Sequence, residues 1–458
     1  MQVSSSAAAS PSAGHGKLTP VLLRSTIVAA IGGLLFGFDT AVIAGATQAL
    51  TQVYNLTPKT LGFTVSIAVW GTVVGAATAG WFGDKYGRRD SLRVLALLYL
   101  ISAIGCAFAP TWTVLVVMRF LVGIAIGGSS VLGPMYIAEV APARLRGRLV
   151  GLFQFNVVAG ILIAYLSNYL VGLGHFGDLE WRVKLGVSAV PALLFFLMLF
   201  TIPRSPRWLV KQKRVDEARN VLRATGEENY EQELKEIVDS IDTEHHQANE
   251  PLFQKKYKLP IFLAMTIGFF NQLAGINAIL YYLNDIFARA GFSKVSSDLQ
   301  AVAIGATNLL FTMVGLAVID KLGRKALLLI GALGTAACLS GVAYVFFSNS
   351  HQTLLLPFLV IYIGFFALSQ GAVIWVYIGE VFPNRVRGKG QSLGSFSHWI
   401  MNAAISFSYP WIIATFGNGT PFIFFAAMTL VQFFTVLFVY PETKGVSLEE
   451  MQHKMGIA

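Results

Sequence analysis

The sequence predicts an all-α membrane protein whose transmembrane helices form two six-helix halves. Apolar side chains make up 55% of the 458 residues and charged side chains only 13%, a composition that favours the bilayer rather than water as solvent. The chain also repeats itself. Residues 136–148 (YIAEVAPARLRGR) recur as 377–389 (YIGEVFPNRVRGK), and 84–89 (DKYGRR) recur as 320–325 (DKLGRK). Both motifs occur in the same order, which is typical of a membrane protein built from two parallel repeats.

The hydrophobic pattern accommodates about twelve spans of roughly 20 residues. The predicted spans of the first half are residues 20–46, 60–82, 92–109, 112–138, 148–171 and 183–203. Those of the second half are residues 258–288, 299–319, 325–347, 354–382, 388–412 and 420–440. The apolar run from Val21 has no obvious cleavage site and is therefore predicted to be a first span rather than a signal peptide.

The segments outside the spans define the domain organisation. Residues 1–19 are small and polar and are predicted to be a disordered tail. Residues 204–257 form the one long polar stretch, which we interpret as a helical linker between the two bundles. The predicted domains are therefore a tail at 1–19, bundles at 20–203 and 258–440 with the linker at 204–257 between them, and a second tail at 441–458.

The distribution of basic residues predicts the orientation of the chain. With both termini inside, few of the 34 lysines and arginines fall on outer segments. These few are Lys59, Arg182, Lys184, Arg289 and Lys294. Such a bias predicts a multi-pass protein of a plasma membrane, of the bacterial inner-membrane type, with cytoplasmic termini. It also accounts for the net charge of +10 without nucleic acid. The two cysteines fall in different halves and indicate neither a disulfide nor a metal site.

The repeated motifs place acids and guanidinium groups at the cytoplasmic ends of both halves. Charges of opposite sign on the same face of two bundles can lock the halves together and release them again. The alternative is that they only determine topology. The predicted cytoplasmic gate residues are Asp84, Arg88, Glu139 and Arg146 with their counterparts Asp320, Arg324, Glu380 and Arg387.

At these motifs the chain resembles the sugar porter family of the major facilitator superfamily. The segments that carry the resemblance are LLFGFDTAVIAG (34–45), GDKYGRR (83–89), RFLVGIAIG (119–127), PMYIAEVAPARLRG (134–147), SPRWL (205–209), NQLAGINAILYY (271–282), DKLGRK (320–325), WVYIGEVFPNRVRG (375–388) and PETKG (441–445). The resemblance implies a major facilitator fold, a monosaccharide carried by alternating access through a monomer, and no cofactor beyond a coupling proton. No nucleophile–base pair, metal cluster or nucleotide loop in the sequence indicates an enzyme.

Two positions depart from the family pattern. Arg204 replaces a glutamate after the sixth span, so one acid of the cytoplasmic network is missing. Ala372 replaces the proline that precedes Trp375, which puts the expected break of the tenth span in doubt.

Polar and aromatic side chains at membrane depth predict the binding site. Such polar groups are costly unless they face a cavity or bind something; amides both donate and accept, which suits sugar hydroxyls, and aromatic faces suit a sugar ring. For a single amide, the alternative is an interhelical hydrogen bond. By resemblance, Gln154, Gln272, Asn277, Asn308, Trp375 and Asn402 match sugar-contacting positions, and Asn271 and Trp399 are assigned with them. The full set of candidates is Phe36, Gln154, Ile161, Asn271, Gln272, Asn277, Tyr281, Tyr282, Asn308, Trp375, His398, Trp399 and Asn402.

Ile161 bears on the choice of sugar. The family's xylose–proton symporter has glutamine at this position and its glucose transporters have isoleucine, so the resemblance favours a hexose such as D-glucose. Xylose, galactose and inositol stay open as alternatives. Gly275, beside Asn277, is predicted to let the seventh span bend over the sugar.

Asp39 and Arg119 are the candidate proton-coupling residues. Asp39 lies in the middle of the first span, where an ionised carboxylate needs a partner, and Arg119 lies deep in the fourth span. By resemblance, aspartate at this position is typical of proton symporters and asparagine of facilitative carriers. The alternatives are a permanent ion pair in a uniporter, and a sugar sensor, which would usually carry a longer cytoplasmic tail.

Overall fold

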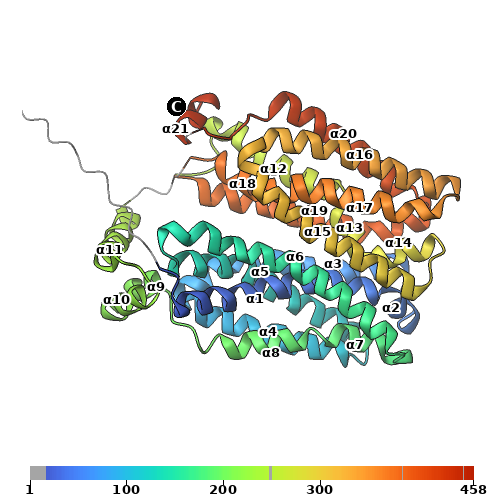
Figure 1. Ribbon diagram of the computed structural model, residues 1–458, viewed down its shortest axis with the longest axis horizontal. Coiled ribbons are helices and arrows are strands. Elements are labelled where there is room, and N and C mark those ends of the chain that lie inside the picture. The colour runs from blue at the N-terminus through green and yellow to red at the C-terminus, as the bar shows by residue number, and fades with distance from the viewer. Residues whose placement is uncertain (1–16, 247–249, 384, 447, 458) are drawn as a thin grey trace, which may run out of the picture.

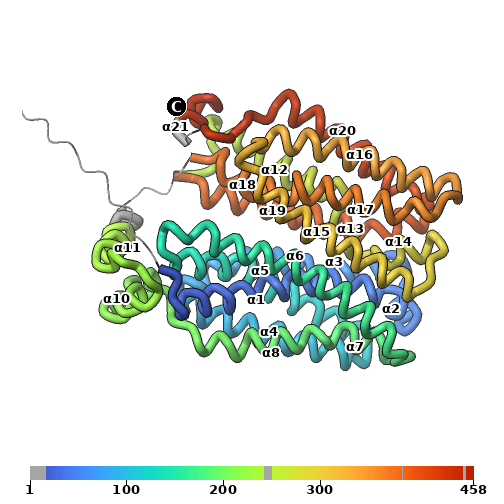
Figure 2. Tube along the Cα trace, viewed as in Figure 1, coloured from blue at the N-terminus to red at the C-terminus, as the bar shows by residue number. Residues whose placement is uncertain are grey.

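The computed structural model in Figure 1 describes residues 17–246, 250–383, 385–446 and 448–457. Over this part of the chain the regular elements are helices, with no strand. Two helical bundles lie side by side, the first drawn in blue to green and the second in yellow to red. The tube in Figure 2 shows the same two bundles, with α10 and α11 outside them at one end. The predicted all-α fold class is confirmed.

The helices of the first bundle follow the predicted spans closely. They are α1 (Pro20–Val42), α3 (Pro58–Tyr86), α4 (Arg88–Ala107), α5 (Trp112–Val140), α6 (Ala143–Leu173), α7 (Glu180–Gly186) and α8 (Ala189–Met198). The short α2 (Thr47–Val53) follows α1. The sixth span is thus two helices, interrupted after Gly186 three residues before α8 begins.

The second bundle contains more interrupted helices. Its elements are α12 (Lys258–Leu273), α13 (Ile276–Tyr281), α14 (Leu283–Arg289), α15 (Lys294–Leu322), α16 (Arg324–Ser348), α17 (Leu355–Phe366), the π-helix η5 (Ala367–Gly371), α18 (Ala372–Glu380), α19 (Arg387–Phe416) and α20 (Thr420–Val439). The seventh span comprises α12 to α14, and the tenth comprises α17, η5 and α18.

Three further helices, α9 (Pro206–Lys211), α10 (Val215–Ala224) and α11 (Tyr230–His246), lie in the segment between the bundles. We call the end of the molecule that carries them the linker end and the opposite end the distal end. Residues 1–16 of the predicted disordered tail lie outside the described residues. Thr19 is described, and its Oγ1 donates to the carbonyl oxygen of Ala224 on α10 at 2.8 Å. In the predicted tail at 441–458, α21 (Leu448–Lys454) forms and buries Met451.

Eleven helical segments in the described chain, some of them joining several helices, are long and apolar enough to cross a membrane. The remaining predicted span is α19, which has 30 residues. Polar residues such as Asn402, Ser406 and Ser408 make its most apolar stretch too polar to be counted with the others. These residues lie in a helix packed against α3 and α12, so the bundle rather than lipid receives much of its polar surface.

The repeated motifs adopt the same backbone conformation in both halves. Gly87, in DKYGRR, has φ 92° and separates α3 from α4; Gly323, in DKLGRK, has φ 91° and separates α15 from α16. These values are strained for residues with a Cβ. The glycine of each motif therefore makes the sharp turn after which an arginine, Arg88 or Arg324, begins the next helix.

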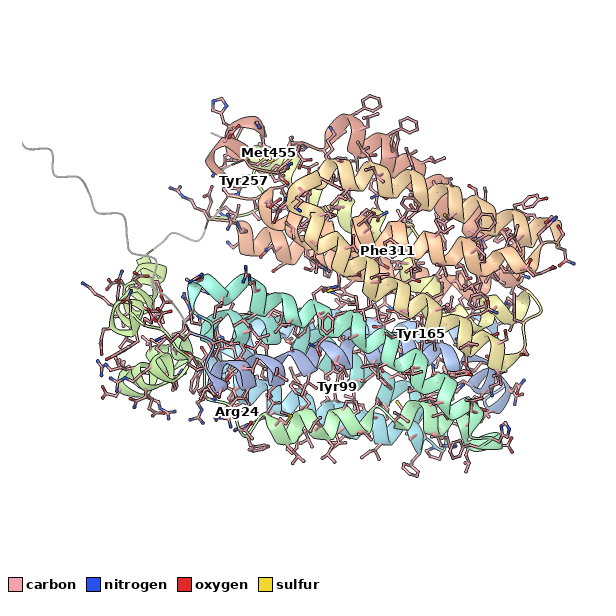
Figure 3. All side chains as sticks on the ribbon, viewed as in Figure 1. Arg24, Tyr99, Tyr165, Tyr257, Phe311 and Met455 are labelled. Carbon is pink, nitrogen blue, oxygen red and sulfur yellow. The ribbon has the colours of Figure 1, made fainter. Side chains whose placement is uncertain are left out.

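The buried core shows where the halves meet. The largest cluster of buried apolar residues contains Phe38 and Tyr165 from the first bundle together with Tyr282, Phe287 and Tyr409 from the second. Separate clusters fill the remainder of each bundle. In Figure 3 Tyr165 lies at the boundary between the bundles, and its hydroxyl donates to the carbonyl oxygen of Leu280 at 2.8 Å.

Helices α1 and α6 approach closely beside the candidate coupling residue. A Cβ on Gly37 would overlap the carbonyl oxygen of Val157, a backbone atom that cannot move alone. We expect Gly37→Ala to destabilise the protein by about 1–3 kcal/mol through overpacking, measured as a lower thermal unfolding midpoint in detergent. Gly151→Ala on α6 is the matched control, because nothing lies within 4 Å of its Cβ. An unchanged midpoint for Gly37→Ala would contradict this packing.

Candidate functional site

A cavity of about 140 Å³ lies between the two bundles, roughly midway along them. Eleven of the thirteen predicted binding residues line it: Phe36, Gln154, Ile161, Asn271, Gln272, Asn277, Tyr281, Asn308, Trp375, His398 and Trp399. Its walls come from α1 and α6 on one side and from α12, α13, α15, α17, η5, α18 and α19 on the other. The structure thus brings most of the predicted set to one place.

Gln272 is the centre of the polar wall of this cavity. Its Nε2 donates to Asn271 Oδ1 at 3.1 Å and lies 3.2 Å from His398 Nε2. Asn277 Nδ2 donates to Gln272 Oε1 at 3.1 Å. An amide N–H can only donate, so the imidazole nitrogen that it meets accepts. The network fixes the direction in which each amide faces the cavity.

Aromatic rings form a second, apolar part of the cavity wall. The ring of His398 lies between two indoles, with centroids 5.1 Å from Trp375 and 5.0 Å from Trp399. Phe36 from the first bundle reaches Trp399 with a centroid separation of 5.7 Å. Flat apolar faces beside amides can hold a ring that carries hydroxyl groups at its edge and C–H bonds on its face.

Two predicted residues lie outside the cavity. Tyr282 points away from it, stacks on Tyr409 and donates to the carbonyl oxygen of Ser406 at 2.9 Å. It follows Tyr281 directly in the chain, but the turn of about 100° between consecutive helical residues directs its ring to Tyr409 and away from the cavity lining. Asn402 is fully buried behind Tyr281, and its Nδ2 donates to the Tyr281 hydroxyl at 3.3 Å.

The cavity also contains residues that the sequence analysis missed. These are Thr40, Val157, Val158, Ile276, Leu280, Thr312, Phe366, Gly371 and Ile374. Helical spacing was a usable signal for several of them. Thr40 lies one turn after Phe36, Thr312 one turn after Asn308, and Val157 and Val158 lie between Gln154 and Ile161 on one face of α6.

Interrupted helices shape the second-half wall. Gly275 separates α12 from α13 with φ 85°, and a Cβ there would overlap the ring of Phe425. The predicted bend of the seventh span is therefore present. In the tenth span the break expected from proline is replaced by the π-helix η5, one turn before Trp375. π-Helical segments of this kind often occur at functional sites, and Gly371 at its end lines the cavity.

Asp39 and Arg119 form the predicted buried pair. Arg119 Nη1 lies 2.7 Å from Asp39 Oδ1, and both residues are at most 9% exposed. A separate cavity of about 20 Å³ adjoins the pair, which is room for about one water molecule. Phe36, Thr40, Tyr281 and Trp399 line both cavities, so the carboxylate and the larger cavity share a wall of side chains.

At the linker end the repeated charges form two matching networks. Arg88 Nε donates to Glu139 at 3.0 Å and Arg88 pairs with Asp84 at 2.8 Å. In the second half Arg324 donates to Glu380 and Asp320 at 2.7 and 2.9 Å. Each of these pairs stays within its own half, so these predicted gate residues do not join the halves in this structure.

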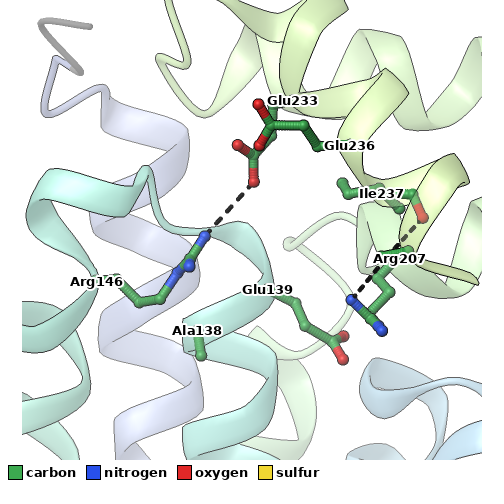
Figure 4. Close-up of a pocket in the computed structure, with 8 residues that line it drawn as sticks. Ala138, Glu139, Arg146, Arg207, Glu233, Glu236 and Ile237 are labelled. Carbon is green, nitrogen blue, oxygen red and sulfur yellow. Dashed lines mark hydrogen bonds and ion pairs between the residues drawn. The ribbon is translucent and has the colours of Figure 1, made fainter. Parts of the chain in front are cut away.

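Arg146 and Arg387 differ from the other predicted gate residues. Figure 4 shows Arg146 pointing to Glu233 of α11, at 3.5 Å, rather than to Glu139. The two residues border a cavity of about 300 Å³ lined also by Ala138, Glu139, Arg207, Glu236, Ile237 and Ser240. Burial raises the pKa of Glu233, against the lowering effect of Arg146. Arg387 Nε and Nη2 are buried and make no hydrogen bond to a described residue.

Arg204 reverses a charge rather than simply removing one. Its Nε donates to Asp90 on α4 at 3.0 Å. At the matching place in the second half, Glu442 accepts from the backbone N–H groups of Arg324 and Lys325 at 2.9 and 3.0 Å. Burial raises the pKa of Glu442, but its backbone donors together outweigh burial and hold that pKa below its ordinary value. In the first half, Asp90 in the first turn of α4 is therefore the acid that pairs with residue 204.

At the distal end, charged pairs cross between the bundles. Lys184 of α7 lies 3.0 Å from Asp298 of α15, and Lys294 of α15 lies 2.8 Å from Glu180 of α7. The sequence analysis placed Lys184 on the outer side, and the structure shows it fully buried at the distal end. The shared core and these pairs hold the bundles together at the end opposite the linker.

The fold and cavity define a membrane carrier with two helical halves and a central polar site. A family model described as "Sugar (and other) transporter" matches residues 25–455. The chain belongs to this family, the sugar porters of the major facilitator superfamily. Membership of a transporter family agrees with the expectation that the chain is not an enzyme.

Two similar proteins align with almost the whole chain. The D-xylose-proton symporter of Escherichia coli (strain K12) is 36% identical over 467 residues, which cover 93% of this chain and 94% of that protein. The major myo-inositol transporter of Bacillus subtilis (strain 168) is 35% identical over 455 residues, 96% of this chain and 95% of that protein.

A solved structure shares the fold. The inward open conformation of the xylose transporter from E. coli is similar with a TM-score of 0.84 and 33% identity, covering 94% of this chain and 99% of that one. In the present structure the bundles share their largest core and their crossing ion pairs at the distal end. The distal end is therefore the closed end.

Proposed function

We propose that the protein imports a monosaccharide together with a proton, by alternating access. The observation that carries the proposal is the buried Asp39–Arg119 pair, which shares a wall with a cavity lined by amides and aromatic rings. A carboxylate that must lose its partner or gain a proton whenever the wall moves can link sugar binding to protonation. The names of the xylose and arabinose relatives, both proton symporters, support this coupling.

In this proposal the cavity residues hold the sugar, Asp39 carries the proton and Arg119 stabilises the unprotonated carboxylate. The two bundles, residues 20–203 and 258–440, rock as units joined by the linker, residues 204–257. The protein works as a monomer in the bilayer. The excess of basic residues supports a cytoplasmic linker end and cytoplasmic termini in a bacterial inner membrane, so the structure would face inward. When the protein turns to face outward, closure of the linker end would bring the networks of Glu139 and Glu380 and the side chain of Arg387 together.

The direct test uses purified protein in liposomes that contain a pH-sensitive dye. An inward gradient of sugar should acidify the lumen if sugar and proton enter together. D-xylose, D-glucose, D-galactose and myo-inositol are tried in turn with a radiolabelled flux measured in parallel. Labelled sugar entering without acidification would make the protein a uniporter and overturn the coupling part of the proposal.

We propose a hexose such as D-glucose as substrate because Ile161 presents an apolar side chain to the cavity. The relatives named for xylose and myo-inositol are the competing candidates. We expect Ile161→Gln to change the ratio of D-glucose to D-xylose transport in favour of xylose by about three- to tenfold, the effect of roughly one hydrogen bond. Competition of the two sugars in counterflow measures this ratio. An unchanged ratio would remove Ile161 as a specificity residue.

A further inference from the structure

Four charged residues form a cluster at the distal end, outside the lining of the central cavity. Glu180 and Lys184 lie on α7, and Lys294 and Asp298 lie on α15. Lys184 Nζ is 2.9 Å from Glu180 Oε1 and 3.0 Å from Asp298 Oδ2, and Lys294 Nζ is 2.8 Å from Glu180 Oε2. Lys184 has no exposed surface and Asp298 is 1% exposed. We call these four residues the distal cluster.

Asp298 reaches across the boundary between the bundles. Its Oδ1 accepts from Asn284 of its own bundle, while its Oδ2 meets Lys184 of the other. The backbone of α6 is also close, because a Cβ on Gly172 would lie 3.0 Å from Asp298 Oδ2. The carboxylate is therefore enclosed by the first bundle only as long as the distal end stays closed.

The spacing of the four residues shows what happens when the bundles separate. Glu180 and Lys184 are four residues apart on α7, and Lys294 and Asp298 are four residues apart on α15. Residues with this spacing are neighbours on one helix face. Each bundle thus carries one acid and one base, in opposite order along the helix. When the crossing pairs break, Lys184 keeps the contact to Glu180 that it already makes, and Lys294 can pair with Asp298 of its own helix.

This arrangement is poorly explained as a device for stability. A buried ion pair often adds nothing over apolar residues of the same size, because both charges lose their hydration. Leaving one of the charges buried without a partner is strongly unfavourable. A cluster that is neutral both as a whole and within each bundle avoids this cost in either arrangement, which suits an interface that opens and closes repeatedly.

We propose that the distal cluster is the outer gate of the transporter, and that its four residues exchange partners across and within the bundles as the gate closes and opens. This inference rests on the proposed alternating-access function. It assigns gating to Glu180, Lys184, Lys294 and Asp298, at the end of the molecule opposite the repeated acid–arginine networks.

Gate opening can be measured without any sugar or proton gradient. Ser297 precedes Asp298, is 1% exposed, and lines a cavity of about 170 Å³ between α2 of the first bundle and α15 of the second. In a Cys106→Ala/Cys338→Ala background, Ser297→Cys introduces a thiol that a hydrophilic maleimide reaches when the bundles separate at this end. Lys59→Cys, at an exposed position at the start of α3, reports the reactivity of an ungated thiol.

The test reverses the charges of one helix at a time in nanodiscs. E180K/K184E keeps a pair within α7 but places like charges opposite Lys294 and Asp298. Like charges across an interface disfavour its closed state strongly, so labelling of Ser297→Cys should rise about tenfold or more. Adding K294D/D298K restores opposite charges across the boundary and should return the rate to within about threefold of the starting protein.

A milder variant covers the case in which the charge reversal fails to fold. Lys294 is half-exposed and joins the halves through Glu180 alone, so Lys294→Met removes one crossing pair with little risk to folding. We expect it to raise labelling about two- to fivefold. Unchanged labelling in Lys294→Met, or in a folded E180K/K184E protein, would overturn the gate, as would a quadruple variant that stays open. Failure of sugar transport would overturn the proposed function while leaving these labelling rates intact.

Discussion

Asp39→Asn is expected to abolish the accumulation of sugar against a gradient while exchange of sugar continues. Asparagine keeps the size of the side chain and can still bond Arg119, so the pair in the wall of the cavity keeps its shape. It cannot bind and release a proton, however. If one proton enters with one sugar, each unit of pH difference drives about tenfold accumulation, and in the variant this ratio should fall to one.

The measurement is uptake of radiolabelled sugar into liposomes at several imposed pH differences, with counterflow at uniform pH as the test of exchange. Asp285→Asn is the matched control, because Asp285 is a partly buried acid on α14 that lines neither cavity. The control should accumulate sugar to the same final ratio as the starting protein. Accumulation that survives in Asp39→Asn would show that the proton binds elsewhere; loss of counterflow as well would show that Asp39 is needed for the sugar site itself.

The two-bundle fold and the polar side of the cavity could be predicted because both follow from local rules. Apolar runs of sufficient length are predicted as spans whatever their packing, and the repeated motifs show their order. Amides such as Gln272 and Asn308 are conspicuous at membrane depth because few polar residues are tolerated there. The apolar residues of the cavity wall, such as Ile276 and Phe366, cannot be distinguished by sequence from the many other apolar residues of the chain.

What the sequence could not provide is the rotation of each helix and the pairing of residues between bundles. Tyr281 and Tyr282 are chemically alike, and only the packing of α13 decides that the first faces the cavity and the second faces Tyr409. Lys184 was predicted only as a charge on the outer side, because its acceptor Asp298 lies more than a hundred residues away in the chain. Because Ala372 stands in place of a proline, the sequence left the break of the tenth span in doubt. The structure has a π-helix there, which no sequence rule predicts.

Gln272→Ala is expected to weaken sugar binding by roughly 5- to 150-fold with little change in the maximal rate of transport. The side chain joins Asn271, Asn277 and His398 into one network. In the proposed site its removal therefore deletes a contact to the sugar and releases the groups that its amide oriented. An unsatisfied buried polar group costs about 1–3 kcal/mol, which corresponds to that loss of affinity. The half-saturating sugar concentration in counterflow measures it.

Gln432→Ala separates this effect from general destabilisation. Gln432 on α20 is equally buried in the second bundle and accepts a 2.9 Å hydrogen bond from Gln370, away from the cavity. Both substitutions leave buried amides without a partner, so both should lower the thermal unfolding midpoint in detergent to a similar extent. Only Gln272→Ala should raise the half-saturating concentration. An equal loss of affinity in both variants would mean that Gln272 acts through the packing of the bundle, and the cavity would then need another residue as its principal sugar contact.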